Sequence, residues 1–223
     1  HLTLDTSEVF AAHVMVSDAA ASCALRIIDD EELEYVALRQ LTVANGSGDG
    51  LCVGDTLADD WRLVMENSIV WGNQGDDIVL RVSAGGTINA AITHSTYATL
   101  VNNRPMLAAP TATLNSDPQF VNPAIGDYEL GGSSNSINSA LLLANSWGDR
   151  DLKGDARIFG SLADRGALES PIGSTATTLT VTNSNNSGLG SLRQALLDAN
   201  ASSNLNTIEF AIGSTCGPHI INL

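Results

Sequence analysis

Two pairs of adjacent aspartates, Asp59–Asp60 and Asp76–Asp77, are the residues best suited to do chemistry in this sequence. A pair of carboxyl groups can hydrolyse a glycosidic bond when one protonates the leaving group and the other activates water. Arg62 and Arg81 stand close to these pairs and could serve as the base of a polysaccharide lyase. Each aspartate pair lies beside a turn, however, and surface arginines offset an acidic chain. We therefore interpret these groups as solvated corners and expect no catalytic residues.

The segment Asp149-Arg-Asp-Leu-Lys-Gly-Asp155 is the main candidate for a metal site. It resembles the start of a calcium loop, with carboxylates at the first and third positions and glycine at the sixth. Lys153 stands at the fifth position and Gly160 at the twelfth, where an EF-hand needs an oxygen ligand and a glutamate. His94 has no obvious carboxylate to orient it, so we interpret it as structural. We expect no cofactor, with calcium at this loop as the alternative.

The three cysteines, Cys23, Cys52 and Cys216, form no Cys-x-x-Cys pair and have no histidine at zinc spacing. An odd number of cysteines excludes complete pairing within one chain. Cys23 and Cys52 could form one disulfide if the chain is extracellular. Cys216 would then be left over, either buried as a small apolar residue, which we favour, or paired with another subunit.

Composition and charge narrow the class of protein. The chain has 223 residues, of which 43% are hydrophobic and 16% charged, so it has enough apolar material to fold. Its formal net charge of -15 would repel the phosphate backbone of nucleic acid and an anionic membrane surface. Its apolar stretches are shorter than the roughly 20 residues of a membrane helix, so we expect no transmembrane segment. The first residue is histidine, which suggests a processed product or a piece of a longer chain.

Short β-rich runs separated by glycine, asparagine, aspartate and serine dominate residues 1–130, where helical periodicity is nearly absent. Two of them, Leu38–Gly46 and Leu63–Asn73, each run into an Asn/Gly turn, at an offset of a little over 25 residues. A repeat of this length suits a solenoid coil, although a β-sandwich could show the same spacing of turns. The clearest predicted strands are residues 9–16, 24–28, 35–43, 61–70, 77–82 and 87–93.

The segment Trp61-Arg-Leu-Val-Met-Glu-Asn-Ser-Ile-Val-Trp-Gly-Asn73 resembles a coil of bacterial right-handed parallel β-helix proteins of the pectin-lyase-like superfamily. Four later blocks are similar to the segment that ends such β-helices: Asp117–Leu130, Ser136–Ala140, Asp151–Arg157 and Asp164–Ser170. The resemblance implies an all-β, right-handed parallel β-helix, or solenoid. Hydrolases of the family carry Asn-Thr-Asp and Gly-His-Gly motifs, which this sequence lacks. The implied protein is therefore non-enzymatic.

A second group of blocks is similar to the opening of the same family: Leu179–Asn200, Asn206–Gly213 and Gly217–Leu223. Its local pattern also predicts structure directly, because Ser191-x-x-Gln194 forms a capping box after Gly190. A helix of about ten residues would carry one apolar stripe, made of Leu192, Ala195, Leu196 and Ala199. This short amphipathic helix would cover the open end of a stack of β-coils.

In this chain the blocks that resemble the end of a β-helix come first, and the blocks that resemble its opening come last. This order is the inverse of the order in the family. We predict coils and a closing segment over residues 1–170, a linker at 171–175, and an opening and capping segment over 176–223. Exposed strand edges and an uncapped apolar core are costly, so the last segment needs a partner. Either the chain is one unit of a tandem array, or this segment docks on the open end of the next copy and builds a filament.

Such an assembly would use β-strand addition, in which a segment of one unit pairs with the exposed coil of the next. The predicted donor residues are Leu179, Val181, Leu192, Leu196, Ile208, Phe210, Ile220 and Leu223. The predicted acceptor residues are Leu2, Leu4, Val9 and Phe10.

The sequence thus predicts a secreted or cell-surface module, structural or adhesive, whose partners are copies of itself arranged head to tail. The alternative is a polysaccharide-degrading or glycan-binding domain of the same fold, with its site around residues 59–94 and surface glycans as partners. A passive spacer within a larger surface protein is a third interpretation.

Overall fold

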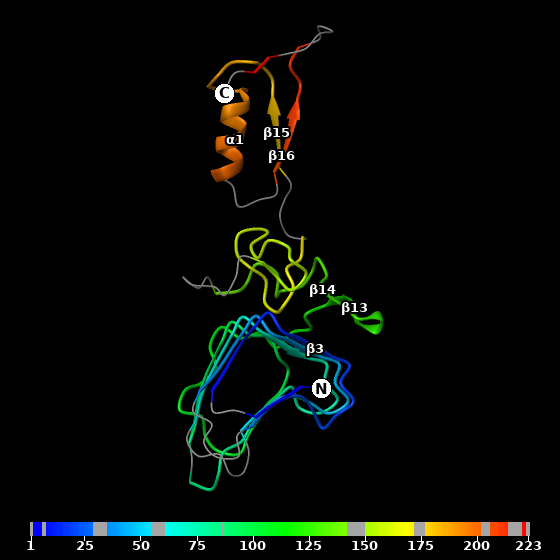
Figure 1. The fold of residues 1–223 in the computed structure, drawn as a ribbon, viewed down its shortest axis with the longest axis vertical. Coiled ribbons are helices and arrows are strands. Elements are labelled where there is room, and N and C mark those ends of the chain that lie inside the picture. Colours follow the sequence, from blue (N-terminus) through cyan, green and yellow to red (C-terminus); the bar gives the residue numbers. More distant parts are fainter. Residues whose placement is uncertain are drawn as a thin grey trace. The chain divides into compact units, whose positions relative to one another are not determined.

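The computed structural model describes residues 2–5, 8–28, 35–54, 61–85, 87–141, 150–171, 177–201, 206–213 and 220–221. The chain divides into two compact units (Figure 1), which comprise residues 1–158 with 162–172 and residues 159–161 with 173–223. The predicted linker at 171–175 lies outside the described residues apart from Pro171. No helix in the described part of the chain is long and apolar enough to cross a membrane.

The first unit is built from three parallel sheets that the chain visits in turn, so that every third strand from β1 to β11 returns to the same sheet, and β12 then joins the first sheet. The first sheet has the order β1-β4-β7-β10-β12, formed by Leu2–Asp5, Cys23–Ile28, Asp49–Val53, Ile78–Leu80 and Leu100–Asn102. The second has the order β2-β5-β8-β11, formed by Glu8–Ala12, Tyr35–Arg39, Trp61–Glu66 and Ile88–Thr93. The third has the order β3-β6-β9, formed by Met15–Ser17, Thr42–Ala44 and Ile69–Trp71.

Each strand pairs in parallel with the strand one turn later. Val9 lies opposite Val36, and Val36 opposite Leu63. Hydrogen bonds between successive turns join residues 27 apart, such as Ser68 N–H to Ser95 Oγ at 3.2 Å. This confirms the parallel β-solenoid predicted from the sequence and excludes the β-sandwich, whose sheets are antiparallel.

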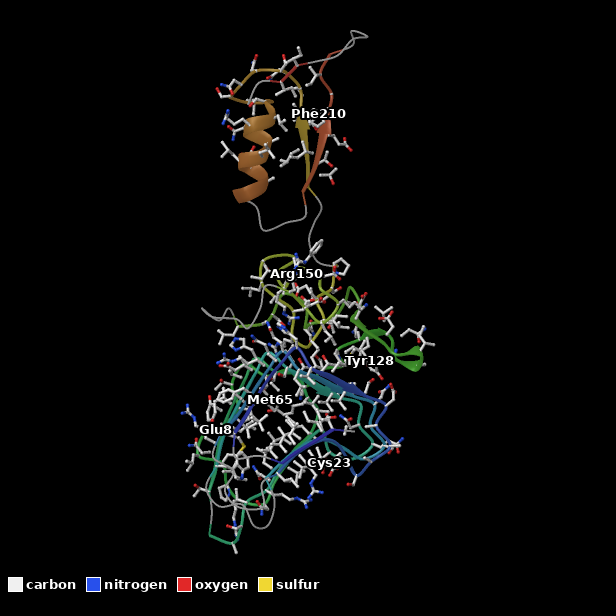
Figure 2. The ribbon with its side chains drawn as sticks, viewed as in Figure 1. Glu8, Cys23, Met65, Tyr128, Arg150 and Phe210 are labelled. Atoms are coloured by element: carbon white, nitrogen blue, oxygen red, sulfur yellow. A yellow bond between two sulfur atoms is a disulfide. The ribbon has the colours of Figure 1, made fainter. Side chains whose placement is uncertain are left out.

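The core fills the interior of the solenoid with one side chain in two from each strand. Leu25, Leu51 and Ile78 stack at the same position of successive turns and are fully buried. Met65 points into the same interior (Figure 2) and is also fully buried. Each such side chain stabilises the fold by about 1.5–3 kcal/mol through removal of apolar surface from water. Apolar side chains stacked from turn to turn therefore build this core.

Left-handed backbone corners divide strands that the sequence predicted as continuous. His13, Gln40, Asn67 and His94, each 27 residues after the last, have φ between 46° and 54°. They separate β2 from β3, β5 from β6 and β8 from β9, so the predicted runs 9–16, 35–43 and 61–70 each become two strands. A second column of positive φ values consists of Asp18, Asn45 and Gly72. Non-glycine residues adopt this conformation at a cost, which Asn and Asp tolerate best.

The segment after the last coil lies along the side of the solenoid. It starts with a hairpin of β13 (Phe120–Asn122), the 3-10 turn η1 (Pro123–Ile125) and β14 (Asp127–Leu130). Tyr128 Oη then donates to the Asp18 carboxylate of the first turn, at 2.9 and 3.0 Å. Ala167 N–H donates to Thr42 Oγ1 of the second turn. We call residues 127–171 the strap, because they bridge successive turns.

Asn67 is the strongest attachment of the strap to a corner. Its buried side chain accepts from Leu141 N–H at 2.7 Å and donates to Leu141 C=O at 3.0 Å. Its own carbonyl accepts from Gly166 N–H at 2.7 Å. One corner residue therefore fixes two separate points of the strap.

Two substitutions of Asn67 should distinguish the free energy of its hydrogen bonds to the strap from the free energy cost of its left-handed backbone. Asn67→Gly keeps the left-handed corner without strain and removes the two side-chain hydrogen bonds, so we expect a loss of about 1–2 kcal/mol in unfolding free energy. Asn67→Ala should lose about 1 kcal/mol more, because alanine is strained at positive φ. Urea unfolding followed by tryptophan fluorescence would measure both. Equal losses in the two variants would contradict this account of the corner.

The second unit is a β-α-β element. Strands β15 (Thr177–Val181) and β16 (Asn206–Phe210) pair in parallel, and the helix α1 (Leu192–Ala201) packs against β15. The helix has the predicted length of ten residues. Ser191 Oγ caps it by accepting from Gln194 N–H at 3.2 Å. The reciprocal half of the predicted capping box is absent from the described contacts, because Gln194 donates to Asp198 and Ser191 N–H to Gly188.

Candidate assembly edges and outer-face pocket

The first turn of the solenoid ends all three sheets. Strands β1, β2 and β3 are terminal in their sheets, so each has one edge without a partner strand among the described residues. A terminal strand can pair with a strand of another chain. The interior is also open here, since Leu4, Ala11 and Val16 are only half-buried against the core.

The four predicted acceptor residues divide between two faces. Leu2 and Leu4 lie opposite the buried residues Leu25 and Ile27, so both occupy inward positions, yet Leu2 is 38% exposed. Val9 is inward and buried. Phe10 is 52% exposed and packs on Tyr35 with ring centroids 5.4 Å apart.

The orientation of Phe10 follows from that of the residue before it in β2. Its neighbour Val9 points into the core, and successive strand residues alternate between faces. Phe10 therefore belongs to the outer face of β2.

Four of the predicted donor residues lie opposite one another on the two strands of the second unit. Leu179 lies opposite Ile208, and Val181 opposite Phe210. Val181 is fully buried, whereas Phe210 is 58% exposed. Leu196 and Ile220 are also exposed, Leu192 is half-buried, and Leu223 lies outside the described residues. The unit thus leaves large apolar side chains in water beside a strand edge.

The strap contains a buried network of charges to which the sequence analysis gave no roles. Arg157 is 3% exposed, and its Nη2 donates to the carbonyls of Asp164 and Gly166 at 2.7 and 2.6 Å. Burial lowers the pKa of Arg157, while the carboxylates of Glu169, Asp164 and Asp151 raise it. The resemblance marked these segments as motifs, and the structure shows that they hold the strap together.

Asp164 is the carboxyl group in this network whose proton affinity differs most from that of an exposed aspartate. Burial raises the pKa of Asp164 to about 6, although N–H groups of Asn138 and Ser170 and the charge of Arg157 act in the opposite direction. The folded chain therefore holds a proton between about pH 4 and 6 that the unfolded chain has released. Stability from this group is present at low pH and is lost as the pH rises through that window.

Asp164→Asn should remove this pH dependence. The difference in unfolding free energy between the wild type and Asp164→Asn should shift by on the order of 3 kcal/mol in favour of the wild type as the pH falls from 7 to 4. Asp155→Asn, which changes an exposed carboxylate of the same strap, serves as the control. Chemical denaturation at several pH values would measure the differences. A constant difference for Asp164→Asn would rule out a protonated Asp164.

The candidate calcium loop uses its central carboxylate for backbone contacts. Asp151 Oδ1 accepts from Lys153 N–H and Asp155 N–H, and Oδ2 accepts from Glu169 N–H, all at 2.9 Å. Lys153 pairs with Glu129. Asp149 lies outside the described residues. Within residues 150–155 the carboxylate therefore serves as a turn-forming group.

Two of the candidate catalytic residues, Asp77 and Arg62, have partners in the described part of the structure. Asp77 is buried and accepts from Asn73 Nδ2, Ala98 N–H and Thr99 N–H. The guanidinium of Arg62 lies over the Tyr35 ring at 5.6 Å. Asp59–Asp60 lies outside the described residues.

His94 occupies a corner of the solenoid. Its Nδ1 is 2.8 Å from Thr93 Oγ1, and burial lowers its pKa. The position is set by the left-handed backbone described above, which histidine can adopt.

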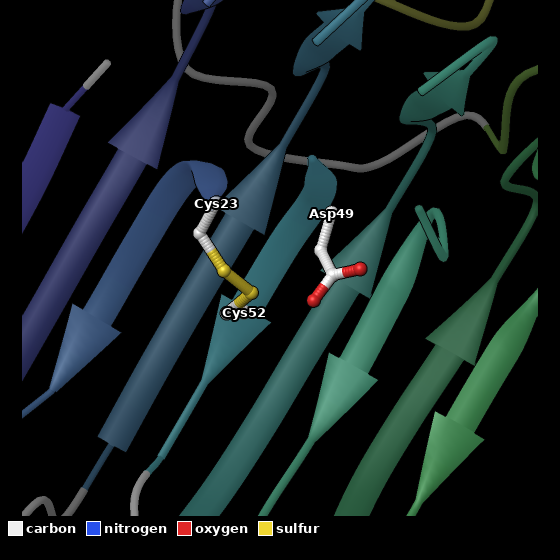
Figure 3. Close-up of side chains that lie close together, drawn as sticks. All are labelled: Cys23, Asp49 and Cys52. Carbon is white, nitrogen blue, oxygen red and sulfur yellow. A yellow bond between two sulfur atoms is a disulfide. The ribbon is translucent and has the colours of Figure 1, made fainter. Parts of the chain in front are cut away.

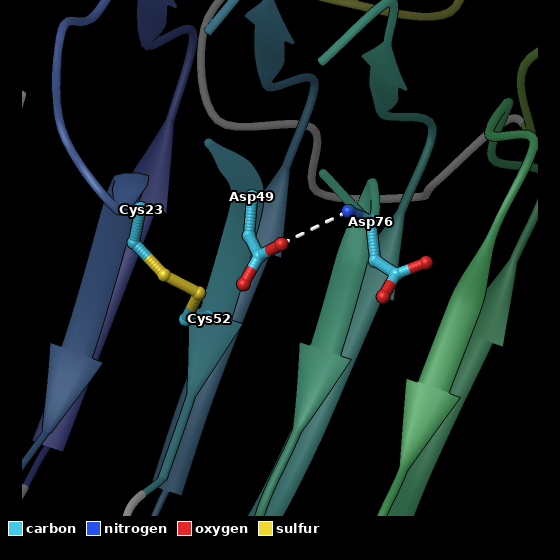
Figure 4. Close-up of a disulfide and its surroundings, with 4 residues drawn as sticks. All are labelled: Cys23, Asp49, Cys52 and Asp76. Carbon is cyan, nitrogen blue, oxygen red and sulfur yellow. Dashed lines mark hydrogen bonds between the residues drawn. A yellow bond between two sulfur atoms is a disulfide. The ribbon is translucent and has the colours of Figure 1, made fainter. Parts of the chain in front are cut away.

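A pocket of about 260 Å³ lies on the outer face of the first sheet. It is lined by Ser22, Cys23, Arg26, Asp49, Cys52, Gly54, Val79 and Arg81. Cys23 and Cys52 form a disulfide between β4 and β7, with Cα atoms 6.2 Å apart (Figure 3). Asp49 lies beside it, and Asp49 Oδ1 accepts from Asp76 N–H at 2.9 Å (Figure 4).

Cys23, Asp49 and Cys52 are the one group of described residues whose ligand atoms are close enough to hold a metal ion. Both sulfurs are engaged in the disulfide, and metals bind thiolates. In the oxidised protein this group is therefore a covalent link between turns. Comparison with protein-family models, curated proteins and solved structures gave no match to this chain. The features that bear on function are therefore the edges of the terminal strands and the pocket beside the disulfide.

Proposed function

We propose that this chain is a non-enzymatic structural or adhesive module that assembles head to tail outside the cell or on its surface. The module would be a right-handed parallel β-helix of the pectin-lyase-like type. One observation carries the proposal: the first turn leaves three strand edges and a half-open core, and the second unit carries paired strands with an exposed apolar layer. Each feature supplies what the other lacks, because strand addition satisfies edge groups and covers apolar side chains.

Size in solution tests the proposal directly. The wild-type chain should form concentration-dependent oligomers in sedimentation velocity experiments and extended particles in electron micrographs. Phe210→Asp should weaken association by roughly 10- to 100-fold, because a large apolar contact worth about 1.5–3 kcal/mol is replaced by a charge. The helical signal of α1 in circular dichroism would show that the second unit still folds.

Val101→Asp is the matched control, since Val101 is 44% exposed on β12, at the opposite end of the first sheet from β1. It should assemble like the wild type. A wild-type chain that stays monomeric at every concentration would end the proposal, and so would equal association of the two variants.

The pocket beside the disulfide favours glycan binding as a second candidate function. Its polar lining includes Arg26 and Arg81, and its volume suits a single sugar ring better than a long chain. Heat stabilisation of the protein by neutral or acidic oligosaccharides tests this candidate. Unchanged melting temperatures across such a panel would count against it.

A further inference from the structure

The strands of each sheet advance along the solenoid in chain order. In the second sheet β2 is followed by β5, β8 and β11, all parallel. Strands β15 and β16 repeat this relation, because Thr177 pairs in parallel with Asn206, 29 residues later. The spacing is close to the 27 residues between turns of the solenoid. The second unit therefore has the geometry of two successive turns of one sheet.

We propose that β16 of one copy pairs in parallel with β2 of the next, with Ile208 opposite Val9. This proposal rests on the head-to-tail function and names its strand and register. The joined sheet would have the order β15-β16-β2-β5-β8-β11. Of the two donor strands, β16 must be the one beside β2, because the later strand always lies further along the stack. If β15 paired with β2 instead, the earlier strand β15 would lie further along the stack than the later strand β16.

The faces of the two strands limit the register to steps of two residues. On β2, Val9 and Ala11 face the core side and Glu8 and Phe10 face outward. On β16, Ile208 and Phe210 share the face of the buried Val181, opposite the exposed residues Thr207 and Glu209. Continuity of the apolar interior therefore places Ile208 or Phe210 at the inward positions of β2.

The charge and the volume of the side chains at opposite positions favour one of the remaining registers. With Ile208 opposite Val9, Phe210 meets the small Ala11, and Glu8 meets Thr207. A shift that places Phe210 opposite Val9 brings Glu8 directly against Glu209, and like charges at such positions are destabilising. The opposite shift places Asn206 against Val9 and Phe210 against the corner residue His13.

Disulfide trapping between copies tests the register. All variants carry Cys216→Ser, and single cysteines are introduced in separate chains that are then mixed in a thiol–disulfide buffer. Acceptor Ala12→Cys should cross-link roughly tenfold faster with donor Ala211→Cys than with donor Glu209→Cys, because only the paired position has a high effective concentration. Acceptor Glu8→Cys should likewise prefer donor Thr207→Cys to donor Glu209→Cys.

The outcomes separate this inference from the function on which it rests. Oligomers that form while Glu209→Cys reacts faster with either acceptor would overturn the register and leave head-to-tail assembly intact. Oligomers in which no mixture cross-links would overturn the β16–β2 pairing. A chain that remains monomeric would overturn both.

Discussion

Arg157→Ala is expected to lower the unfolding free energy of the solenoid by about 3–5 kcal/mol at neutral pH. The side chain is buried beside the carboxyl groups of Asp151, Asp164 and Glu169, and its Nη2 holds two carbonyls of the strap. Without the guanidinium these acidic groups have no opposing charge in their buried surroundings. The loss should shrink at acidic pH, because burial raises the pKa of Asp164 to about 6 and this carboxyl group gains a proton below that pH.

Arg150→Ala is the matched control, because Arg150 is an exposed arginine of the same strap that donates to Gly154 C=O. It should cost no more than about 0.5 kcal/mol. Urea unfolding with fluorescence detection is suitable, since Trp61 is buried in the solenoid core. If the two arginine variants unfold at the same urea concentration, the buried network does not stabilise the strap.

Reduction of the Cys23–Cys52 disulfide is expected to cost about 3–4 kcal/mol, the value that the chain-entropy relation gives for a closed loop of 29 residues. The link joins neighbouring turns, so its loss frees the unfolded chain more than it alters the folded one. The double variant Cys23→Ser/Cys52→Ser should show the same loss without reductant. Thiol titration of the unfolded, unreduced wild type should find one reactive cysteine, and three after reduction.

Cys216→Ser controls for the remaining thiol, and reductant should lower its unfolding midpoint by as much as that of the wild type. A reductant that destabilises the double serine variant as much as the wild type would show that the effect arises elsewhere. If neither reduction nor substitution moves the midpoint, the disulfide contributes nothing to stability.

The repeat and most strands could be predicted because short β-rich runs recur between turn-forming residues. Leu25 and Ile78 lie in predicted runs, whereas β7, which contains Leu51, lies outside them. The column of corners could not be predicted from local chemistry, since Gln40 is not a residue that usually adopts a left-handed backbone. Their 27-residue spacing with Asn67 is the signal that could have located them.

The strap was recognised as a segment, but its internal contacts were not foreseeable. The sequence motif contains Asp151, Arg157 and Asp164 without showing which groups would be buried together. Burial of a charge depends on the side of the solenoid against which the segment packs, and this is a long-range property. Of the predicted capping box, the hydrogen bond from Gln194 N–H to Ser191 Oγ is present. The reciprocal bond is absent from the described contacts, because the Gln194 side chain donates to Asp198 one turn away.

The corners are spaced at a constant 27 residues along the sequence, so the turns that they bound have the same length. In the second and third sheets a strand residue and its successor are 27 positions apart, and each turn presents similar surfaces to both neighbours. Removal or duplication of a full 27-residue stretch would therefore preserve every inward side chain, whereas a change of one residue would invert the faces that follow. Such a protein can change its length through duplication or deletion of whole turns without the loss of its interior.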